Sequence, residues 1–258
     1  MPRFCANLDF LFTERPFLDR FAAARAAGFG AVEILFPYDH DPGAIAARLN
    51  DEGLTLALIN TPAPDWARGG RGSAALSGQG ARFRAEFTHA RDLAARLGAG
   101  HLHVLAGCAG GQEAHDSYQE NLAWAADAAP EQSLTIEPIN TADIPGYFLS
   151  RFDLATRILD TLARPNLGLQ FDAYHAQRIT GAALDLWTRI GHRARHVQVA
   201  GLPDRHEPIK GAVDYPAFFA RLDAAGYDGW VSGEYRPAAR TEDGLDWIAP
   251  APMAAPGG

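Results

Sequence analysis

Residues 134–140 read Leu-Thr-Ile-Glu-Pro-Ile-Asn, a short apolar run that carries one glutamate, Glu137, near its end. Three later runs have the same form: Leu167–His175 carries Asp172, Arg195–Gly201 carries Gln198, and Gly229–Tyr235 carries Glu234. Runs of this length and composition predict buried strands. If the four strands are parallel neighbours, their polar side chains meet at one end of the sheet.

Outward from these runs, short strand-like segments alternate with segments of helical period that are rich in alanine, leucine and arginine. This alternation predicts repeated βα units. Eight strands are expected, beginning near Phe4, Ala31, Leu54, His101, Leu134, Leu167, His196 and Trp230. Seven helices are expected at Arg20–Ala27, Pro42–Asp51, Ala81–Leu97, Tyr118–Ala128, Asp153–Leu162, Ala182–Ile190 and Tyr215–Ala225, with an eighth after Glu242.

The chain has 258 residues, of which 47% are hydrophobic and 21% are charged. That length fits one α/β domain, and eight βα units fit a single (β/α)8 TIM barrel. We therefore predict one barrel over residues 1–249. Residues 250–258 are rich in proline, alanine and glycine, so we expect a mobile tail there.

The formal net charge of -8 opposes a function based on neutralising phosphates, so nucleic acid is not an expected partner. Cys5 and Cys108 are too few and too far apart to indicate a disulfide framework, which favours reduced thiols and a cytoplasmic location. The N-terminus does not read as a signal peptide, and no apolar run is long enough to span a bilayer, so no membrane association is expected. The number of subunits stays open.

Glu137 is expected at the rim of the sheet. Pro138 cannot donate a hydrogen bond to a neighbouring strand, so the strand ends here. A carboxylate in this position is costly unless it is solvated, paired or bound to a metal. Taken alone, Glu137 is also explained as an exposed strand-end residue, and Glu234 as half of an ion pair with Arg236.

A shared cation explains all four polar strand ends together. The predicted ligands are Glu137, Asp172, Gln198 and Glu234, one from each of strands five to eight. Carboxylate and amide oxygens suit hard divalent ions, so Mg²⁺ or Mn²⁺ is expected in preference to zinc.

Three further residues are candidates for binding substrate. His175 follows Asp172 by three residues and reaches the same pocket if the chain turns, although such a histidine also serves as a simple hydrogen-bonding residue. Arg205 follows the seventh strand, where its guanidinium can hold a substrate carboxylate through two parallel hydrogen bonds. Lys210 and the Arg68–Arg71 segment compete for that role.

Other residues of the predicted barrel mouth are open to two interpretations. The segment Pro62–Gly80 is rich in glycine and is a candidate lid over the active site. Glu33, His101 and His103 lie on predicted strands two and four, where packing or capping roles are the favoured interpretation.

Four segments resemble the hydroxypyruvate isomerase family of the xylose isomerase-like barrel superfamily. They are Ile-Glu-Pro-Ile-Asn at 136–140, Phe-Asp-Ala-Tyr-His-Ala-Gln at 171–177, His-Val-Gln-Val-Ala-Gly-Leu-Pro-Asp-Arg-His-Glu-Pro at 196–208, and Gly-Glu-Tyr-Arg-Pro at 233–237. The resemblance extends over nearly the whole chain, from Phe4 to Leu245, and residues 198–208 are its most specific part.

This resemblance implies a (β/α)8 fold and a divalent cation held by the residues that match Glu137, Asp172, Gln198 and Glu234. It also implies reversible conversion of hydroxypyruvate to tartronate semialdehyde. Together with the predicted pocket, it indicates an enediolate mechanism in which Glu137 and Glu234 form the acid and base pair, in an unassigned direction.

Three alternatives remain open. The related ketose 3-epimerases carry histidine where Gln198 stands and glutamate where Asp143 falls, which favours a 2-oxo acid, either hydroxypyruvate or a longer one such as 2-oxo-tetronate, over a free ketohexose. An apurinic-type endonuclease on the same barrel would need more histidine ligands, tightly bound zinc and a basic groove. A non-catalytic barrel that binds sugar acids would keep the pocket without turnover.

Overall fold

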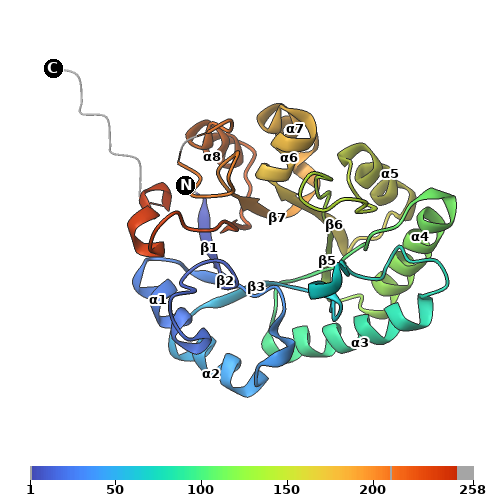
Figure 1. The fold of residues 1–258 in the computed structure, drawn as a ribbon, viewed down its shortest axis with the longest axis horizontal. Helices are drawn as coiled ribbons and strands as arrows, with labels where there is room; N and C mark the ends of the chain where they lie inside the picture. The colour runs from blue at the N-terminus through green and yellow to red at the C-terminus, as the bar shows by residue number, and fades with distance from the viewer. Residues whose placement is uncertain (1, 210, 249–258) are drawn as a thin grey trace.

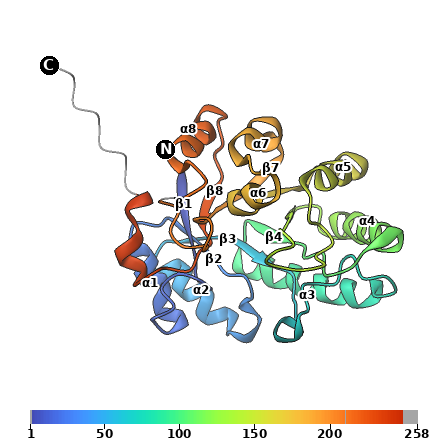
Figure 2. The same ribbon diagram turned by 45° about the horizontal axis from the view of Figure 1, so that its top comes forward.

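Eight parallel strands close into a barrel at the centre of the molecule, and helices surround it (Figures 1 and 2). The structure is a computed structural model that describes residues 2–209 and 211–248. The strands pair in chain order, and β8 closes the barrel by pairing with β1, for example at Phe4 and Val231. The predicted (β/α)8 TIM barrel is thereby confirmed. The predicted tail, residues 250–258, lies outside the described residues.

Each strand begins within two residues of its predicted start. The strands are β1 Arg3–Asn7, β2 Ala31–Glu33, β3 Thr55–Asn60, β4 His101–His103, β5 Ser133–Ile136, β6 Leu167–Asp172, β7 Ala194–Val199 and β8 Trp230–Gly233. Most of their residues are buried, because helices cover the outside of a parallel barrel while side chains fill the inside.

Six of the seven helices predicted by residue range agree to within one residue at each end. The α-helices are α1 Arg20–Ala26, α2 Pro42–Asp51, α3 Gly80–Leu97, α4 Gly111–Ala128, α5 Phe152–Leu162, α6 Ala173–Thr180, α7 Ala183–Ile190 and α8 Tyr215–Ala224. The exception is α4, which begins at Gly111 and not at Tyr118.

Helix α6 is not predicted from the sequence, because no loop separates it from β6. Asp172 ends the strand and also caps the helix: its Oδ1 accepts a hydrogen bond from the backbone N–H of Tyr174 at 2.7 Å. This shared residue holds the carboxylate of Asp172 at the carboxyl end of the barrel.

The eighth helix expected after Glu242 is replaced by two short 3-10 helices, Thr241–Gly244 and Asp246–Ile248. Gly244 lies within this segment and the sequence has prolines at 250 and 252, which together disfavour a regular α-helix. The buried ring of Trp247 lies edge-on to Phe4 of β1 and donates a hydrogen bond to the Tyr235 hydroxyl. The segment therefore covers β1 as a helix would.

An aromatic cluster fastens the helices to the strands that carry the candidate site. Phe171 of β6 lies 5.2 Å from the ring of Trp187 in α7 and 6.0 Å from that of Phe218 in α8, measured between centroids. Burying each such side chain contributes on the order of 2 kcal/mol to folding. Among the described residues, no helix combines the length and hydrophobicity needed to cross a bilayer.

Candidate active site

Polar side chains fill much of the inside of the barrel. In TIM barrels this volume is commonly packed with branched apolar residues. Here the buried polar residues of the strands include Asn7, Glu33, Thr135, Gln170, His196 and Gln198. Because polar groups removed from water must find partners, these side chains are expected to form a hydrogen-bond network that ends at the pocket.

The four predicted metal ligands reach the carboxyl end of the barrel from consecutive strands. Glu137 directly follows β5, Asp172 ends β6, Gln198 lies in β7, and Glu234 directly follows β8. Asp172 and Gln198 are register partners on neighbouring strands. All four residues are at most 7% exposed. The expected convergence in space is present, while the ligand roles themselves stay predictions.

Glu137, Asp172 and His175 form the tightest cluster of the site. One candidate ligand atom from each of the three lies within 4.8 Å of the others. Nε2 of His175 is 3.5 Å from Oδ2 of Asp172 and 3.8 Å from Oε1 of Glu137. These two carboxylate oxygens are buried and accept no hydrogen bond from any described residue. Neighbouring buried carboxylate oxygens that accept no hydrogen bond are what a divalent cation would satisfy, so the residues fit such an ion.

Gln198 joins this cluster through its neighbour Gln170. The Nε2 group of Gln170 donates to Oε1 of Gln198 at 2.7 Å and to Oε2 of Glu137 at 3.1 Å. The Oε1 of Gln170 accepts a hydrogen bond from Thr135 at 3.0 Å, which fixes the orientation of its amide. The amide nitrogen of Gln170 thus bridges the oxygen of Gln198 and the carboxylate of Glu137.

Glu33 holds the other end of the Gln198 amide. Its Oε1 accepts hydrogen bonds from Nε2 of Gln198 at 2.6 Å and from Nδ2 of Asn7 at 2.8 Å, and Nε2 of His196 lies 2.7 Å from its Oε2. Burial raises the pKa of Glu33 to about 7. Glu33 therefore supports the predicted ligand Gln198 from beneath, a role beyond the packing or capping expected for it.

Sequence reasoning missed Gln170, His196 and this role of Glu33. A usable signal exists for Glu33, because it is the one acidic residue within the apolar run Ala31–Leu35, much as Glu137 lies within Leu134–Asn140. Gln170 and His196 lie inside strands, and the sequence alone does not distinguish a buried polar network from a solvated strand face.

Arg205 lies against two of the predicted metal ligands. Its Nη2 is 2.6 Å from Oε2 of Glu234 and 3.5 Å from Oδ2 of Asp172. The guanidinium also lies over the rings of Tyr174 and Phe10, at 4.9 and 5.6 Å from their centroids. Arg205 thus belongs to the pocket, as expected for a substrate-binding residue. Lys210, the other cation predicted there, lies outside the described residues.

The carboxyl groups of the pocket have raised pKa values. Burial raises the pKa of Glu137 well above its usual value, and the charges of Glu234 and Asp172 raise it further. Burial also raises the pKa of Glu234 to about 8 and that of Asp172 to about 6, while Arg205 opposes both shifts. Carboxyl groups of this kind can hold a proton near neutral pH, as acid–base catalysis requires.

A cavity of about 460 Å³ opens above these residues. Its lining includes Glu137, His175, Arg205 and Glu234, together with Trp66 and Arg71 from the segment Pro62–Gly80. His103 also lines the cavity, with Nδ1 at 3.1 Å from Oδ1 of Asn60. By contrast, His101 contacts Ser133 and is not among the lining residues.

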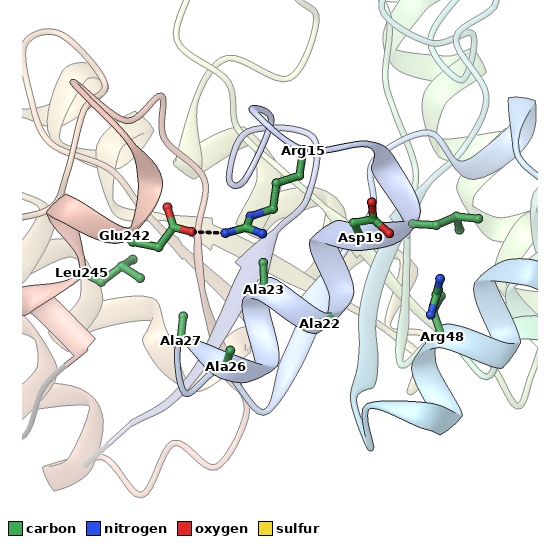
Figure 3. A pocket seen from close by; sticks show the side chains of 10 residues that line it. Arg15, Asp19, Ala22, Ala23, Ala26, Ala27, Arg48, Glu242 and Leu245 are labelled. Atoms are coloured by element: carbon green, nitrogen blue, oxygen red, sulfur yellow. Dashed lines mark hydrogen bonds and ion pairs between the residues drawn. The ribbon is translucent and has the colours of Figure 1, made fainter.

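A second hollow lies outside the barrel, between α1, α2 and the last described residues (Figure 3). Its volume is about 770 Å³, and alanines of α1 form much of its surface. The ion pair between Arg15 and Glu242 crosses it. None of the predicted site residues lines this hollow, so the candidate active site is the smaller cavity at the barrel mouth.

Comparison with protein-family models gives a match to the xylose isomerase-like TIM barrel over residues 21–251. The chain is 48% identical over 256 residues to a 2-oxo-tetronate isomerase of Cupriavidus necator, which covers 97% of this chain and 98% of that protein. It is 38% identical over 256 residues to a hydroxypyruvate isomerase of Escherichia coli, which covers 97% of this chain and 99% of that protein.

Among solved structures, a protein of Brucella melitensis named as an AP endonuclease of family 2 superposes with a TM-score of 0.93 at 42% identity. The match covers 96% of this chain and 98% of that one.

Proposed function

The chain belongs to the xylose isomerase-like TIM barrel family, and we propose that it is a metal-dependent isomerase that interconverts hydroxypyruvate and tartronate semialdehyde. Full-length relatives at 38% and 48% identity are named as isomerases, and the chain is an enzyme of that class. The observation that carries the proposed reaction is a pair of buried carboxylates, Glu137 and Glu234, that line one cavity from different strands.

The proposed cation is Mg²⁺ or Mn²⁺, with Glu137, Asp172, Gln198 and Glu234 as its ligands. The buried oxygens of Glu137 and Asp172 that accept no hydrogen bond from any described residue support this assignment. Nδ1 of His175 accepts a hydrogen bond from the backbone N–H of Asn140, so Nε2 carries the ring proton and His175 is not counted among the proposed ligands. A bound cation of this type supplies Lewis-acid stabilisation to negative charge on the substrate oxygens.

Glu137 and Glu234 form the proposed acid and base pair. One carboxylate removes a proton from C3 of hydroxypyruvate, so that a C2–C3 double bond forms, and the other delivers a proton to C2. The hydroxyl proton moves from O3 to O2, which leaves tartronate semialdehyde with the same atoms and charge. Both carboxylates would flank the proposed cation, whose charge lowers their proton affinity, so the transfer depends on position as much as on basicity.

His175 and Arg205 are proposed to contact the substrate beside the reacting carbons. Both lie next to the carboxylates, and both can donate hydrogen bonds to an oxygen on which negative charge develops. Lys210 keeps its proposed substrate-binding role on the sequence alone. A cytoplasmic location is likewise proposed, and the unpaired thiols of Cys5 and Cys108 support it.

A longer 2-oxo acid is the second candidate substrate. The relative at 48% identity is named for 2-oxo-tetronate, and a cavity of about 460 Å³ has room for a fourth carbon. The chemistry is unchanged, because the oxo and hydroxyl groups occupy the same two carbons, C2 and C3. Measurement of kcat/KM for hydroxypyruvate and for 2-oxo-tetronate decides between the two candidates, because the preferred substrate has the higher value.

The first prediction concerns activity and the metal. We expect the purified protein to interconvert hydroxypyruvate and tartronate semialdehyde, to lose at least about 100-fold in rate after chelation with EDTA, and to recover with Mg²⁺ or Mn²⁺. In heavy water, deuterium should appear on the carbon that is reprotonated. Chromatographic separation of the two isomers measures the isomerisation, and mass spectrometry of the separated product measures the exchange.

Three results would contradict this proposal. A folded, metal-loaded protein that turns over neither hydroxypyruvate nor 2-oxo-tetronate would exclude the isomerase reaction. Binding of these acids without deuterium exchange would indicate a non-catalytic barrel. Tightly bound zinc with cleavage of abasic DNA would favour an endonuclease, the activity for which the Brucella protein is named. The net charge of -8 opposes that last outcome.

A further inference from the structure

We propose that Arg71 is the residue that binds the carboxylate of the substrate, and that it makes the enzyme selective for oxo acids over uncharged sugars of the same length. This inference rests on the proposed function, because it concerns the substrate of the same cavity. Arg71 lines the cavity together with Glu137, His175 and Glu234.

Arg71 has no acidic partner among the described residues, unlike the other enclosed arginines of the cavity. Arg205 is paired with Glu234 and Asp172, and Arg178 lies 3.8 Å from Asp143. The Nε of Arg71 is buried and makes no hydrogen bond to any described residue. A buried, unpaired guanidinium nitrogen is unfavourable in isolation, so a bound anion would satisfy it.

The guanidinium of Arg71 is already held in position. Its Nη1 donates to the backbone oxygens of Trp66 at 2.8 Å and Gly70 at 2.7 Å, and its Cζ lies over the Trp66 ring, 4.0 Å from the ring centroid. These contacts occupy Nη1 and one face of the planar guanidinium group. Since a side chain fixed before binding loses little entropy on binding, the remaining donors form a prepared anion site.

The backbone at Arg71 is equally constrained. Gly72 forms an antiparallel bridge with Ala106 in the loop after β4, and the N–H of Ala75 donates to the Ala106 oxygen at 2.7 Å. The side chain of Asn121 in α4 donates to the oxygen of Ala74 at 2.9 Å. Arg71 therefore stands at the edge of a firmly docked segment.

Arg71 and Arg205 approach the cavity from opposite sides. Arg71 follows β3 and Arg205 follows β7, and these strands are four positions apart in a closed barrel of eight. A 2-oxo acid whose carboxylate lies at Arg71 extends its reacting carbons toward Glu137 and Glu234. Arg205 stays beside Glu234, where it can interact with the substrate oxygens that change charge.

The test compares the binding of D-glycerate with that of glyceramide, its uncharged match, to the Mn²⁺-loaded enzyme. We expect the wild-type protein to bind glycerate at least about 30-fold more tightly than glyceramide. In Arg71→Met the two affinities should differ by no more than about three-fold, because only the affinity for glycerate is lost. The KM for hydroxypyruvate should rise by a similar factor, with a smaller change in kcat.

Arg68→Met is the matched control, because Arg68 lies in the same loop, is 83% exposed and pairs with Asp65. In this variant the ratio of the affinity for glycerate to that for glyceramide should equal the wild-type ratio. Should Arg71→Met fail to fold by circular dichroism, Arg71→Gln replaces it as a second neutral variant.

An unchanged ratio in a folded neutral variant of Arg71 would overturn the inference. So would a collapse of the ratio in Arg205→Met with Arg71→Met unaffected, since Arg205 would then bind the carboxylate. Both results are independent of turnover. A wild-type enzyme that binds glycerate selectively through Arg71 but isomerises no oxo acid would contradict only the proposed reaction.

Discussion

Glu137 and Glu234 illustrate how position converts ordinary glutamates into reactive groups. Each directly follows the last residue of a strand, and each is at most 7% exposed. Water cannot stabilise their charge there, so their pKa values rise. The site remains compatible with two such groups because Arg205 pairs with Glu234 and because the proposed cation would lie beside the oxygens of Glu137 and Asp172 that accept no hydrogen bond.

At this scale we expect Glu137→Gln and Glu234→Gln each to lower kcat by about a thousand-fold or more, because an amide cannot exchange the substrate proton. The melting temperature should change little in Glu137→Gln, because Glu137 makes no ion pair with a described arginine, and should fall in Glu234→Gln, which removes a partner of Arg205. Steady-state kinetics and thermal melts measure the two effects. Glu113→Gln, an exposed position on α4, is the control and should match the wild type. Near-normal rates in both pocket variants would refute the assigned roles.

At the scale of elements, the connections after the strands position the site. Because β6 runs straight into α6, the cap formed by Asp172 uses its Oδ1 and leaves Oδ2 beside His175 and Arg205, 3.5 Å from a nitrogen of each. The connection after β3 brings Trp66 and Arg71 to the cavity. Its docked part depends on Gly72, where φ is +99° and an added Cβ would lie 2.4 Å from Cβ of Leu105.

Gly72→Ala and Gly69→Ala together test whether Gly72 holds the segment after β3 in place. Both glycines have a positive φ, +99° and +91°, but an added Cβ at Gly69 meets nothing within 4 Å. Gly69→Ala should therefore cost only the conformational penalty, about 1 kcal/mol, whereas Gly72→Ala should also displace the segment from Leu105. Hydrogen exchange at the amides of Ala74 and Ala75 should accelerate in Gly72→Ala and not in Gly69→Ala. Equal protection in the two variants would show that Gly72 does not fix the segment.

At the scale of the molecule, the polar interior makes stability depend on pH. Glu33, Asp172 and Glu234 have pKa values of about 7, 6 and 8 in the folded protein, all above their unfolded values near 4. The folded state then binds more protons than the unfolded chain, so ionisation destabilises it as pH rises. Burial lowers the pKa of His103 and His196 to about 3, which opposes this trend only below the unfolded histidine value of about 6.5.

We therefore expect the melting temperature of the protein in EDTA to fall as the pH rises from about 6.5 to about 8. In this range the buried carboxyl groups lose protons, while the histidines are neutral in both the folded and the unfolded protein. Saturating Mn²⁺ should reduce this fall, because an ion that binds only the folded state stabilises it. Thermal melts across this range, with EDTA or with Mn²⁺, test the prediction. Glu234→Gln should flatten the chelated profile. A chelated melting temperature that rises toward pH 8 would contradict the proposed linkage.

The sequence by itself determined the barrel and the strand ends that carry its chemistry. Strand and helix periodicity depends on near neighbours in the chain, so eight βα units and the positions of Glu137, Asp172, Gln198 and Glu234 were predictable. The same locality explains two of the three errors, those other than the start of α4. Helix α6 shares Asp172 with β6 and leaves no turn in the sequence, and the segment after Glu242 packs through Trp247 instead of through a regular helix.

Only the tertiary structure decided which side chains meet. Glu33 and Gln198 are 165 positions apart in the chain, and closure of the barrel brings β2 and β7 side chains into its interior, where they form a 2.6 Å hydrogen bond. The partners of Arg71 and Arg205 are set in the same way, by loops that approach the cavity from different strands. Charge pairing and burial act through space, and no local pattern encodes which arginine is left free to bind an anion.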